Sequence, residues 1–266
     1  MVAGVSGGAD SLALLALACE AGLAVTAVHV DHGLRAGSAA EAEVVGTAAR
    51  RLGAADVRCV AVSVAPGPNL EARARDARLD ALGPGALTGH TADDAAETVL
   101  LNLLRGAGLD GLAGIRPGPT KPLLGLRRAE TRALCDELGL VPFEDPSNAD
   151  PAFRRNRVRH EVLPLLDDVA QRDVSALLAR SAGLLGDDAA LLDALAGSLD
   201  PTDARALAAA PVPLARRAVR RWLADPYPPD AATVERVLTV ARGDALATDV
   251  GGGRSVRRSG QRLHLT

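Results

Sequence analysis

Short apolar runs alternate with amphipathic stretches through the first 115 residues of the chain. The runs that are typical of β-strands are Val2–Val5, Ala24–Val30, Val57–Val64 and Ala86–Gly89. Between them, apolar residues recur at helical spacing over residues 10–21, 38–53, 69–82 and 92–105. This alternation predicts an α/β fold, a doubly wound parallel sheet with helices on both faces.

A different pattern begins near residue 116, where Pro and Gly interrupt the alternation. Helices are predicted near 127–139 and 156–166, on either side of a polar loop, and then at 173–196, 211–223 and 230–241. The last apolar runs, Ala247–Val250, Ser255–Arg258 and Leu263–Leu265, predict a small β-hairpin. We therefore expect an α/β domain over residues 1–165 and a smaller, mainly helical domain over residues 166–266 that ends in the hairpin.

Composition excludes several classes of protein. The chain is 48% hydrophobic and 24% charged, which is typical of globular domains. No apolar stretch reaches the ~18 residues that span a bilayer, and no signal peptide precedes the first strand. Three widely spaced cysteines, Cys19, Cys59 and Cys135, form neither a disulfide framework nor a CxxC metal site. These observations predict a cytoplasmic protein with no membrane association.

The formal net charge of −3 does not indicate nucleic-acid binding, but the arginines are clustered. The clusters lie within Arg154–Arg159, Arg216–Arg221 and Arg254–Arg262. Either they follow the phosphates of a nucleic acid or they form a solvated surface, and the sequence leaves both interpretations open. Lys121 is the one lysine among 30 basic side chains. In a chain so rich in arginine, this indicates that a compact ammonium group is required at that position.

The segment Ser6-Gly-Gly-Ala-Asp-Ser11 joins the first predicted strand to the first helix. The two glycines permit a tight turn, and the N–H groups at the start of the helix then face a bound oxyanion. The hydroxyls of Ser6 and Ser11 add donors, and Asp10 is a candidate ligand for Mg²⁺. No Gly-Lys-[Ser/Thr] follows, so this is not the Walker pattern. An ordinary turn that caps a helix is the alternative.

Two further polar segments follow strands of the predicted sheet: His29 to Arg35 after the second, and Gly89 to Glu97 after the fourth. Because ligands of such sheets bind beyond the C-terminal ends of the strands, we expect one site to contain all three polar segments. Two histidines and an aspartate at one strand end are a weak set of metal ligands, so nucleotide or substrate binding is the preferred interpretation of the first segment.

The segment after the fourth strand carries an acidic face. Thr91 is the predicted N-cap of a helix, and Asp93, Asp94 and Glu97 fall in its first turns. Their i,i+3 and i,i+4 spacings place the acids together, where they could hold Mg²⁺ or a substrate ammonium group. The alternative is helix capping alone, since the helix dipole favours acids there by about 0.3–1 kcal/mol each.

Candidates for phosphate binding lie on other elements: Arg75, Arg78, Arg105, Arg155 and Arg159. A surface salt bridge between Glu71 and Arg75 is the alternative for the first of them. Asp145-Pro-Ser-Asn148 predicts an Asx-type turn, which with the following basic helix could equally form a hinge between domains.

In this order the segments resemble the tRNA(Ile) lysidine synthetases, a family of PP-loop ATP pyrophosphatases. The resemblance rests on the motifs Ser6–Ser11, His29-Val-Asp-His-Gly-Leu-Arg35, Glu71-Ala-Arg-Ala-Arg75, Gly89-His-Thr-Ala-Asp-Asp-Ala-Ala-Glu-Thr98, Arg105-Gly-Ala-Gly108 and Asp145–Arg159. Together these cover residues 2–165. The remaining hundred residues match only in outline, as a helical tRNA-contacting domain.

The resemblance implies a sheet of the adenine nucleotide alpha hydrolase-like type and a reaction in two steps. ATP, with Mg²⁺, would adenylate the C2 oxygen of the wobble cytidine of a CAU-anticodon tRNA(Ile). Free L-lysine would then attack C2 through its ε-amino group and expel AMP. The product, lysidine, pairs with A rather than G and switches the tRNA from methionine to isoleucine.

The resemblance also implies roles for individual residues. ATP would be bound by Ser6, Gly7, Gly8, Ala9, Asp10, Ser11, His29, Gly89 and His90, and Mg²⁺ by Asp10 and Asp94. The catalytic residues would be Asp10, Asp94, Glu97 and Arg105. The tRNA or lysine would contact Asp31, His32, Arg35, Arg75, Arg78, Lys121, Arg155 and Arg159. Asp94 or Glu97 would pair with the lysine ammonium and help to deprotonate it, and which of the two does so is left open.

Two other functions stay open on the sequence. A PP-loop tRNA thiolase would need paired cysteines or an iron–sulfur cluster, and the three isolated cysteines argue against it. A catalytically idle tRNA-binding protein would not need Asp10, Asp94 and Arg105. The sequence does not fix the oligomeric state, and a homodimer is one of the states it allows.

Overall fold

The computed structural model describes residues 1–31, 38–63, 67, 70–225 and 227–266. The described chain divides into two compact units, residues 1–185 and 186–266. Among the predicted site residues, His32 and Arg35 lie outside the described residues. The helices of the described residues include none with the length and apolar character needed to cross a membrane.

The first unit is built on a parallel sheet in the order β1-β2-β3, with β1 at Val2–Gly4, β2 at Thr26–Asp31 and β3 at Asp56–Ala61. The predicted fourth strand, Ala86–Gly89, is reduced to an isolated parallel bridge between Leu87 and Ala3. Leu87 donates to the carbonyl of Val2 (2.8 Å) and accepts from the N–H of Gly4 (2.9 Å), while the N–H of Thr88 faces the other way and donates to the carbonyl of Thr120 (2.9 Å).

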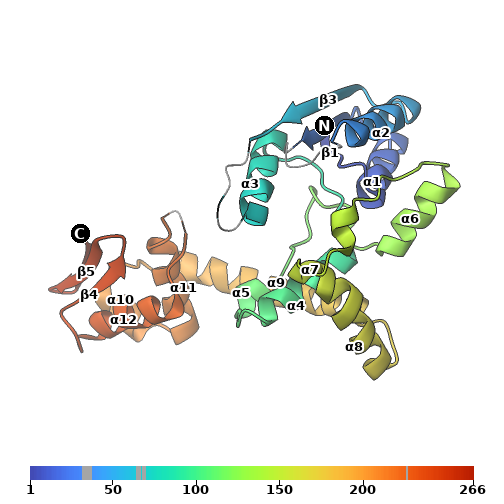
Figure 1. The fold of residues 1–266 in the computed structure, drawn as a ribbon. Coiled ribbons are helices and arrows are strands. Elements are labelled where there is room, and N and C mark those ends of the chain that lie inside the picture. The colour runs from blue at the N-terminus through green and yellow to red at the C-terminus, as the bar shows by residue number, and fades with distance from the viewer. Residues whose placement is uncertain (32–37, 64–66, 68–69, 226) are drawn as a thin grey trace. The chain divides into compact units, whose positions relative to one another are not determined.

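Helices cover both faces of this sheet, as the alternation predicts. Helices α1 (Ala9–Glu20) and α2 (Ser38–Arg51) lie on one side of β1, and α3 (Leu70–Leu82) lies on the other (Figure 1). The side chains of Ala3 and Ala27 pack in the core with α1 and α2, while those of Val28 and Val30 pack with Leu82 of α3. The doubly wound α/β prediction is confirmed.

The rest of the first unit is helical. Its α-helices are α4 (Ala92–Leu103), α5 (Leu109–Leu112), α6 (Arg128–Glu137), α7 (Arg154–Arg157), α8 (Leu163–Ala170) and the start of α9 (Val174–Gly197). A 3₁₀-helix, η1 (Pro146–Ala149), precedes α7, and a π-helix, η2 (Val158–Val162), joins α7 to α8. The helix predicted over 156–166 is thus three consecutive segments, α7, η2 and α8. The break has a cause: Pro164 has no N–H to donate to the carbonyl of His160.

The second unit contains the end of α9, three further helices, α10 (Ala204–Ala209), α11 (Val212–Trp222) and α12 (Ala231–Arg242), and a sheet. The sheet is antiparallel, in the order β4 (Ala247–Gly251), β5 (Arg254–Ser259), β6 (Arg262–Leu265). Its side chains Val256 and Leu263 share a core with Val219 of α11 and Leu238 of α12. A mainly helical region that ends in β structure is therefore present, with three strands where a hairpin was predicted.

Candidate active site

The loop between β1 and α1 is held in a sharp bend by its own polar groups. Gly7 has φ +88°, a conformation that favours glycine, and Gly8 is the N-cap of α1. The hydroxyl of Ser11 donates to the carbonyl of Gly8 (2.9 Å) and accepts from the N–H of Ser6 (3.1 Å). The first N–H groups of α1 have no acceptor within the helix, so the bend presents donors to an anion.

Gly89 brings the start of α4 against this loop. A Cβ on Gly89 would lie 2.7 Å from the carbonyl oxygen of Asp10, a separation that no side chain can occupy. The two backbones therefore approach closely only because residue 89 is glycine. This approach places the acidic first turns of α4 beside Asp10.

His29, on β2, is also tied to the loop. Its ring is 2% exposed, and Nδ1 lies 3.1 Å from the carbonyl oxygen of Val5. A carbonyl oxygen only accepts, so Nδ1 carries the hydrogen, and Nε2 is an acceptor when the ring is neutral. Nε2 is buried and has no hydrogen-bond partner in the part of the chain that the structure describes. A buried acceptor without a donor is a candidate contact for a bound nucleotide.

The acids at the start of α4 have distinct partners. Asp94 accepts from the N–H of the N-cap residue Thr91 (2.9 Å), so the predicted cap is confirmed. Asp93 accepts from the Arg127 side chain (2.8 and 3.0 Å) and from the N–H of Arg128 (2.7 Å). Burial alone would raise the pKa of Asp93, but these hydrogen bonds outweigh it and hold the pKa below its ordinary value.

Arg128, at the first position of α6, contacts three carboxylates with three nitrogens. Its Nε lies 3.4 Å from Asp10 Oδ2, Nη2 lies 3.1 Å from Asp94 Oδ1, and Nη1 lies 3.1 Å from Glu97 Oε1. The second oxygen of Asp10 accepts from the hydroxyl of Thr131. Burial raises the pKa of Asp10, and the hydrogen bond from Thr131 and the charge of Arg128 only partly offset it.

Glu97 is the most enclosed acid of the site, with a side chain that is 0% exposed. Besides Arg128, it pairs with Arg159 (Nε to Oε1, 2.7 Å) and with Arg155 (Nε to Oε2, 2.9 Å). Arg155 also donates to the hydroxyl of Thr98 (3.1 Å). One buried carboxylate thus pairs with three guanidinium groups, one each from α6, α7 and η2, and it joins α4 to these three elements.

The turn that precedes α7 is present as predicted. The Asp145 side chain accepts from the N–H of Ser147 (2.9 Å), which is an Asx turn. Asn156 of α7 donates to the carbonyls of Ser147 (2.6 Å) and Asp150 (2.8 Å). These bonds fix the loop to the helix that carries Arg155.

Three arginine side chains lie near His90. The pKa of His90 falls to about 4, chiefly because the ring is buried, and also because Arg75, Arg78 and Arg155 are near; Asp94 opposes this shift. Burial likewise lowers the pKa of Arg78, with repulsion from Arg75 and Arg155 as further causes. Three arginines that repel one another favour an anionic ligand at this place.

The low pKa of His90 predicts a dependence of stability on pH. The unfolded chain binds a proton at His90 near pH 6.5, while the folded protein binds it only near pH 4. Between these values the unfolded state takes up more protons, so the free energy of unfolding falls as the pH falls. His90→Gln should remove about 2 kcal/mol of this loss, as measured by urea unfolding at pH 7 and pH 4.5.

The exposed His160 offers a matched control for that measurement. His160→Gln should keep the loss of stability that the unmodified chain shows between pH 7 and pH 4.5. A His90→Gln variant with an unchanged slope would contradict the assignment of a buried neutral imidazole.

The structure therefore brings together many of the predicted site residues: Ser6–Ser11, His29, Arg75, Arg78, Gly89, His90, Asp94, Glu97, Arg155 and Arg159. Arg105 is not among them. It follows the C-terminal end of α4, is exposed, and contacts Asn102 (3.5 Å). From Asp94 to Leu103, the last residue of α4, the helix rises about 1.5 Å for each of nine steps, and Arg105 lies beyond that end. Asp31 lies at the end of β2.

Sequence analysis missed Arg127, Arg128 and Thr131. Two consecutive arginines at the start of a helix are a usable signal, because the helix dipole disfavours cations there unless an acid compensates them. Nothing in the sequence, however, identifies Asp10, Asp93, Asp94 and Glu97 as the compensating acids, since these lie 31 to 118 residues away.

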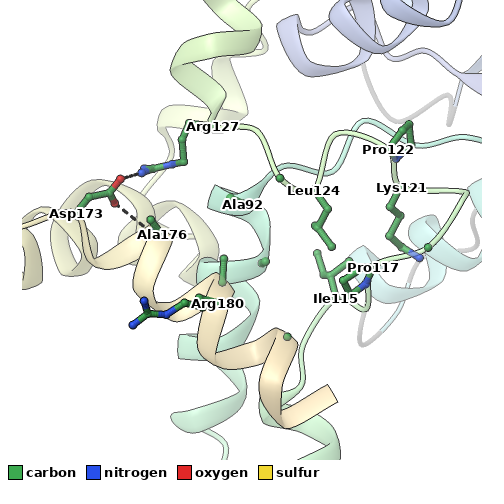
Figure 2. A pocket seen from close by; sticks show the side chains of 15 residues that line it. Ala92, Ile115, Pro117, Lys121, Pro122, Leu124, Arg127, Asp173, Ala176 and Arg180 are labelled. Carbon is green, nitrogen blue, oxygen red and sulfur yellow. Dashed lines mark hydrogen bonds and ion pairs between the residues drawn. The ribbon is translucent and has the colours of Figure 1, made fainter. Parts of the chain in front are cut away.

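Lys121 lies elsewhere, in the wall of a cavity of about 670 Å³ (Figure 2). The cavity is bounded by Ala92 and Ala95 of α4, by the loop that carries Lys121, and by residues of α9 that include Arg180. On α4, Ala92 and Ala95 lie on the face away from Asp94 and Glu97, at 100° per residue. The cavity and the side chains of Asp94 and Glu97 are therefore on different sides of α4.

Comparison with known proteins identifies relatives over most of the chain. The PP-loop domain family matches residues 1–166, and the family described as the TilS substrate binding domain matches residues 203–264. The tRNA(Ile)-lysidine synthase of Nocardia farcinica is 47% identical over 94% of this chain and 84% of its own length. The protein of that name from Mycobacterium tuberculosis is 46% identical over 83% of this chain and 73% of its own.

Among solved structures, the U34-tRNA thiolase NcsA from Methanococcus maripaludis has a similar fold. The TM-score is 0.53 at 20% identity, and the match covers 68% of this chain and 70% of the thiolase. At that identity the likeness concerns the fold alone.

Proposed function

The chain belongs to the tRNA(Ile)-lysidine synthase family, and from that premise we propose that it joins free L-lysine to C2 of the wobble cytidine in a CAU-anticodon tRNA(Ile). ATP is consumed to AMP and pyrophosphate through an adenylated tRNA. The observation that carries this proposal is the juxtaposition of the bend at Ser6–Ser11 with the acids of α4, joined through Asp10. The match to the TilS substrate binding domain supports tRNA as the substrate.

The bend would hold the phosphates of ATP. Its N–H groups and the positive end of the α1 dipole favour an anion there, and they need no rearrangement to receive it. His29 Nε2 would accept from a donor of the nucleotide. Arg75, Arg78 and Arg155 would take up the negative charge that develops as pyrophosphate departs, because their mutual repulsion is relieved by an anion.

The residues present fit Mg²⁺. Asp10 and Asp94 contact the same guanidinium, so their carboxylates face one small volume. Mg²⁺ needs only one or two protein carboxylates when phosphates and water complete its shell. Bound there, Mg²⁺ would supply neutralisation of the triphosphate charge. The described residues contain no cluster of three or more His, Cys, Asp or Glu side chains that could hold a metal ion.

Of the two acids predicted to meet the lysine amine, Asp94 has the more accessible carboxylate. Its side chain is 16% exposed, whereas that of Glu97 is 0% exposed and paired with three arginines. We therefore assign to Asp94 the pairing with the ammonium group and its deprotonation before attack. Glu97 then acts as a positioning residue for Arg155 and Arg159.

Two arginine variants distinguish the charge-neutralising groups. Arg78→Ala should lower AMP formation at least about tenfold, because it removes a cation beside His90 and Asp94. Arg105→Ala should lower it by less than about threefold, because this exposed side chain lies at the other end of α4. Initial rates of AMP release measure both. A larger loss of AMP formation in Arg105→Ala than in Arg78→Ala would support the catalytic role that the sequence predicted for Arg105.

The experiment that tests the function is AMP release by the purified full chain with ATP, Mg²⁺, L-lysine and unmodified tRNA(Ile). The proposal requires sustained AMP release only when both lysine and the tRNA are present. Release with the tRNA and a sulfur donor in place of lysine would favour a thiolase. Binding of tRNA with no AMP release at all would favour an idle tRNA-binding protein.

A further inference from the structure

The guanidinium of Arg128 contacts three carboxylates at once. Its three nitrogens lie within 3.1–3.4 Å of oxygens of Asp10, Asp94 and Glu97. Asp10 and Asp94 are also the two carboxylates that fit Mg²⁺. A side chain that is 27% exposed therefore contacts both members of the metal-binding pair at once.

The position of Arg128 is fixed by groups other than the three carboxylates. Its backbone N–H donates to Asp93 (2.7 Å), and the same carboxylate is held by the neighbouring Arg127 (2.8 Å). The hydroxyl of Thr131, one turn later on α6, donates to Asp10, and its oxygen lies 2.9 Å from the carbonyl oxygen of Arg128. Two residues of α6 thus converge on Asp10 from a rigid helix start.

We propose that Arg128 is a positioning residue that acts as a built-in cation between Asp10 and Asp94 until nucleotide binds. It keeps the carboxylates in place for the metal, yet it prevents a divalent cation from binding there alone. The inference rests on the proposed function, in which these two acids meet a metal–ATP complex.

The physical reason is competition between cations for the same oxygens. A divalent ion that bridges Asp10 and Asp94 must break the contacts of Arg128 with both acids and remain close to its positive charge. The phosphates of a nucleotide change this balance, because they bring negative charge that both the metal and the displaced guanidinium can contact. Metal and nucleotide should therefore bind together.

Binding of Mn²⁺ to the nucleotide-free full chain, followed by electron paramagnetic resonance, tests this inference directly. Arg128→Met removes the charge at similar length, and the protein should then bind Mn²⁺ about tenfold or more tightly than the unmodified chain. Arg128→Gln should do the same, and it serves if the Met variant does not fold. Arg128→Lys retains a cation and should stay within about threefold of the unmodified chain.

Arg132 provides the matched control. It lies on the same helix and pairs with the exposed Glu144 (2.8 Å), away from Asp10. Arg132→Met should leave the affinity for Mn²⁺ unchanged. The inference is overturned if neither Arg128→Met nor Arg128→Gln binds Mn²⁺ more tightly, or if Arg128→Lys binds it as tightly as Arg128→Met.

These measurements need no turnover, so they are separate from the test of the proposed function. A chain that makes no lysidine but shows the predicted order of Mn²⁺ affinities would overturn the function and support this inference. A chain that makes lysidine while all variants bind Mn²⁺ equally would support the function and overturn the inference about Arg128.

Discussion

Asp10→Ala will lower AMP formation by at least about 100-fold while the protein stays folded. Asp10 is the one acid that belongs to the phosphate-binding bend and also contacts Arg128, which links it to Asp94 and Glu97. Its loss removes a ligand for Mg²⁺ and the contact between the bend and α6. Stability should change little, because burial raises the pKa of this carboxylate, and a group with a raised pKa adds little to the stability of the folded protein at neutral pH.

The measurement is the initial rate of AMP release at saturating ATP, with a thermal melt of the same sample. Asp136→Ala is the matched control, because Asp136 is an exposed aspartate on α6. That variant should keep the rate of the unmodified chain. An Asp10→Ala protein that is folded and fully active would contradict the assignment of the bend as the site of ATP.

Glu97→Gln will destabilise the folded protein by about 3 kcal/mol or more. The substitution leaves Arg128, Arg155 and Arg159 around a neutral amide in a place where the side chain is 0% exposed. Arg128 keeps Asp10 and Asp94, but Arg155 and Arg159 lose the acid that pairs with them, which is far more costly than losing an exposed pair. Urea unfolding of both proteins at pH 7 measures the difference in the free energy of unfolding.

Glu161→Gln is the control for that experiment. Glu161 pairs with Arg157 (2.8 Å) at i,i+4 on an exposed helix face, and the loss of such a solvent-screened pair should leave the free energy of unfolding nearly unchanged. Equal destabilisation by the two variants would show that the cluster around Glu97 is not the buried centre that joins α4 to α6, α7 and η2.

The sheet and its covering helices could be predicted because they depend on local periodicity. The alternation of apolar residues in β2 assigns Ala27 to one core and Val28 and Val30 to the other, as the structure has them. The fourth strand was wrong as a full strand: residues 86–89 pair with β1 at Leu87 alone, and their extent depends on a partner more than 80 residues away in the sequence. Long-range pairing of this kind leaves no local pattern.

In the site, too, local features could be predicted from the sequence and contacts between distant residues could not. The bend at Ser6–Ser11 and the cap at Thr91 are local, and the sequence predicted both. The ion pairs of Glu97 span 31, 58 and 62 residues, and the contact between Arg128 and Asp10 spans 118. The sequence also did not reveal that Arg155 and Arg159, two of the arginines predicted to bind phosphate, are held by this acid.

Nucleoside analysis of the tRNA after reaction tests the central claim most directly. Unmodified CAU-anticodon tRNA(Ile) is incubated with the full chain, ATP, Mg²⁺ and L-lysine, digested to nucleosides, and examined by liquid chromatography and mass spectrometry. The account predicts that the wobble cytidine is replaced by lysidine, and that omission of lysine leaves no lysidine. A wobble cytidine that stays unmodified with all substrates present, or one that carries sulfur, would contradict it.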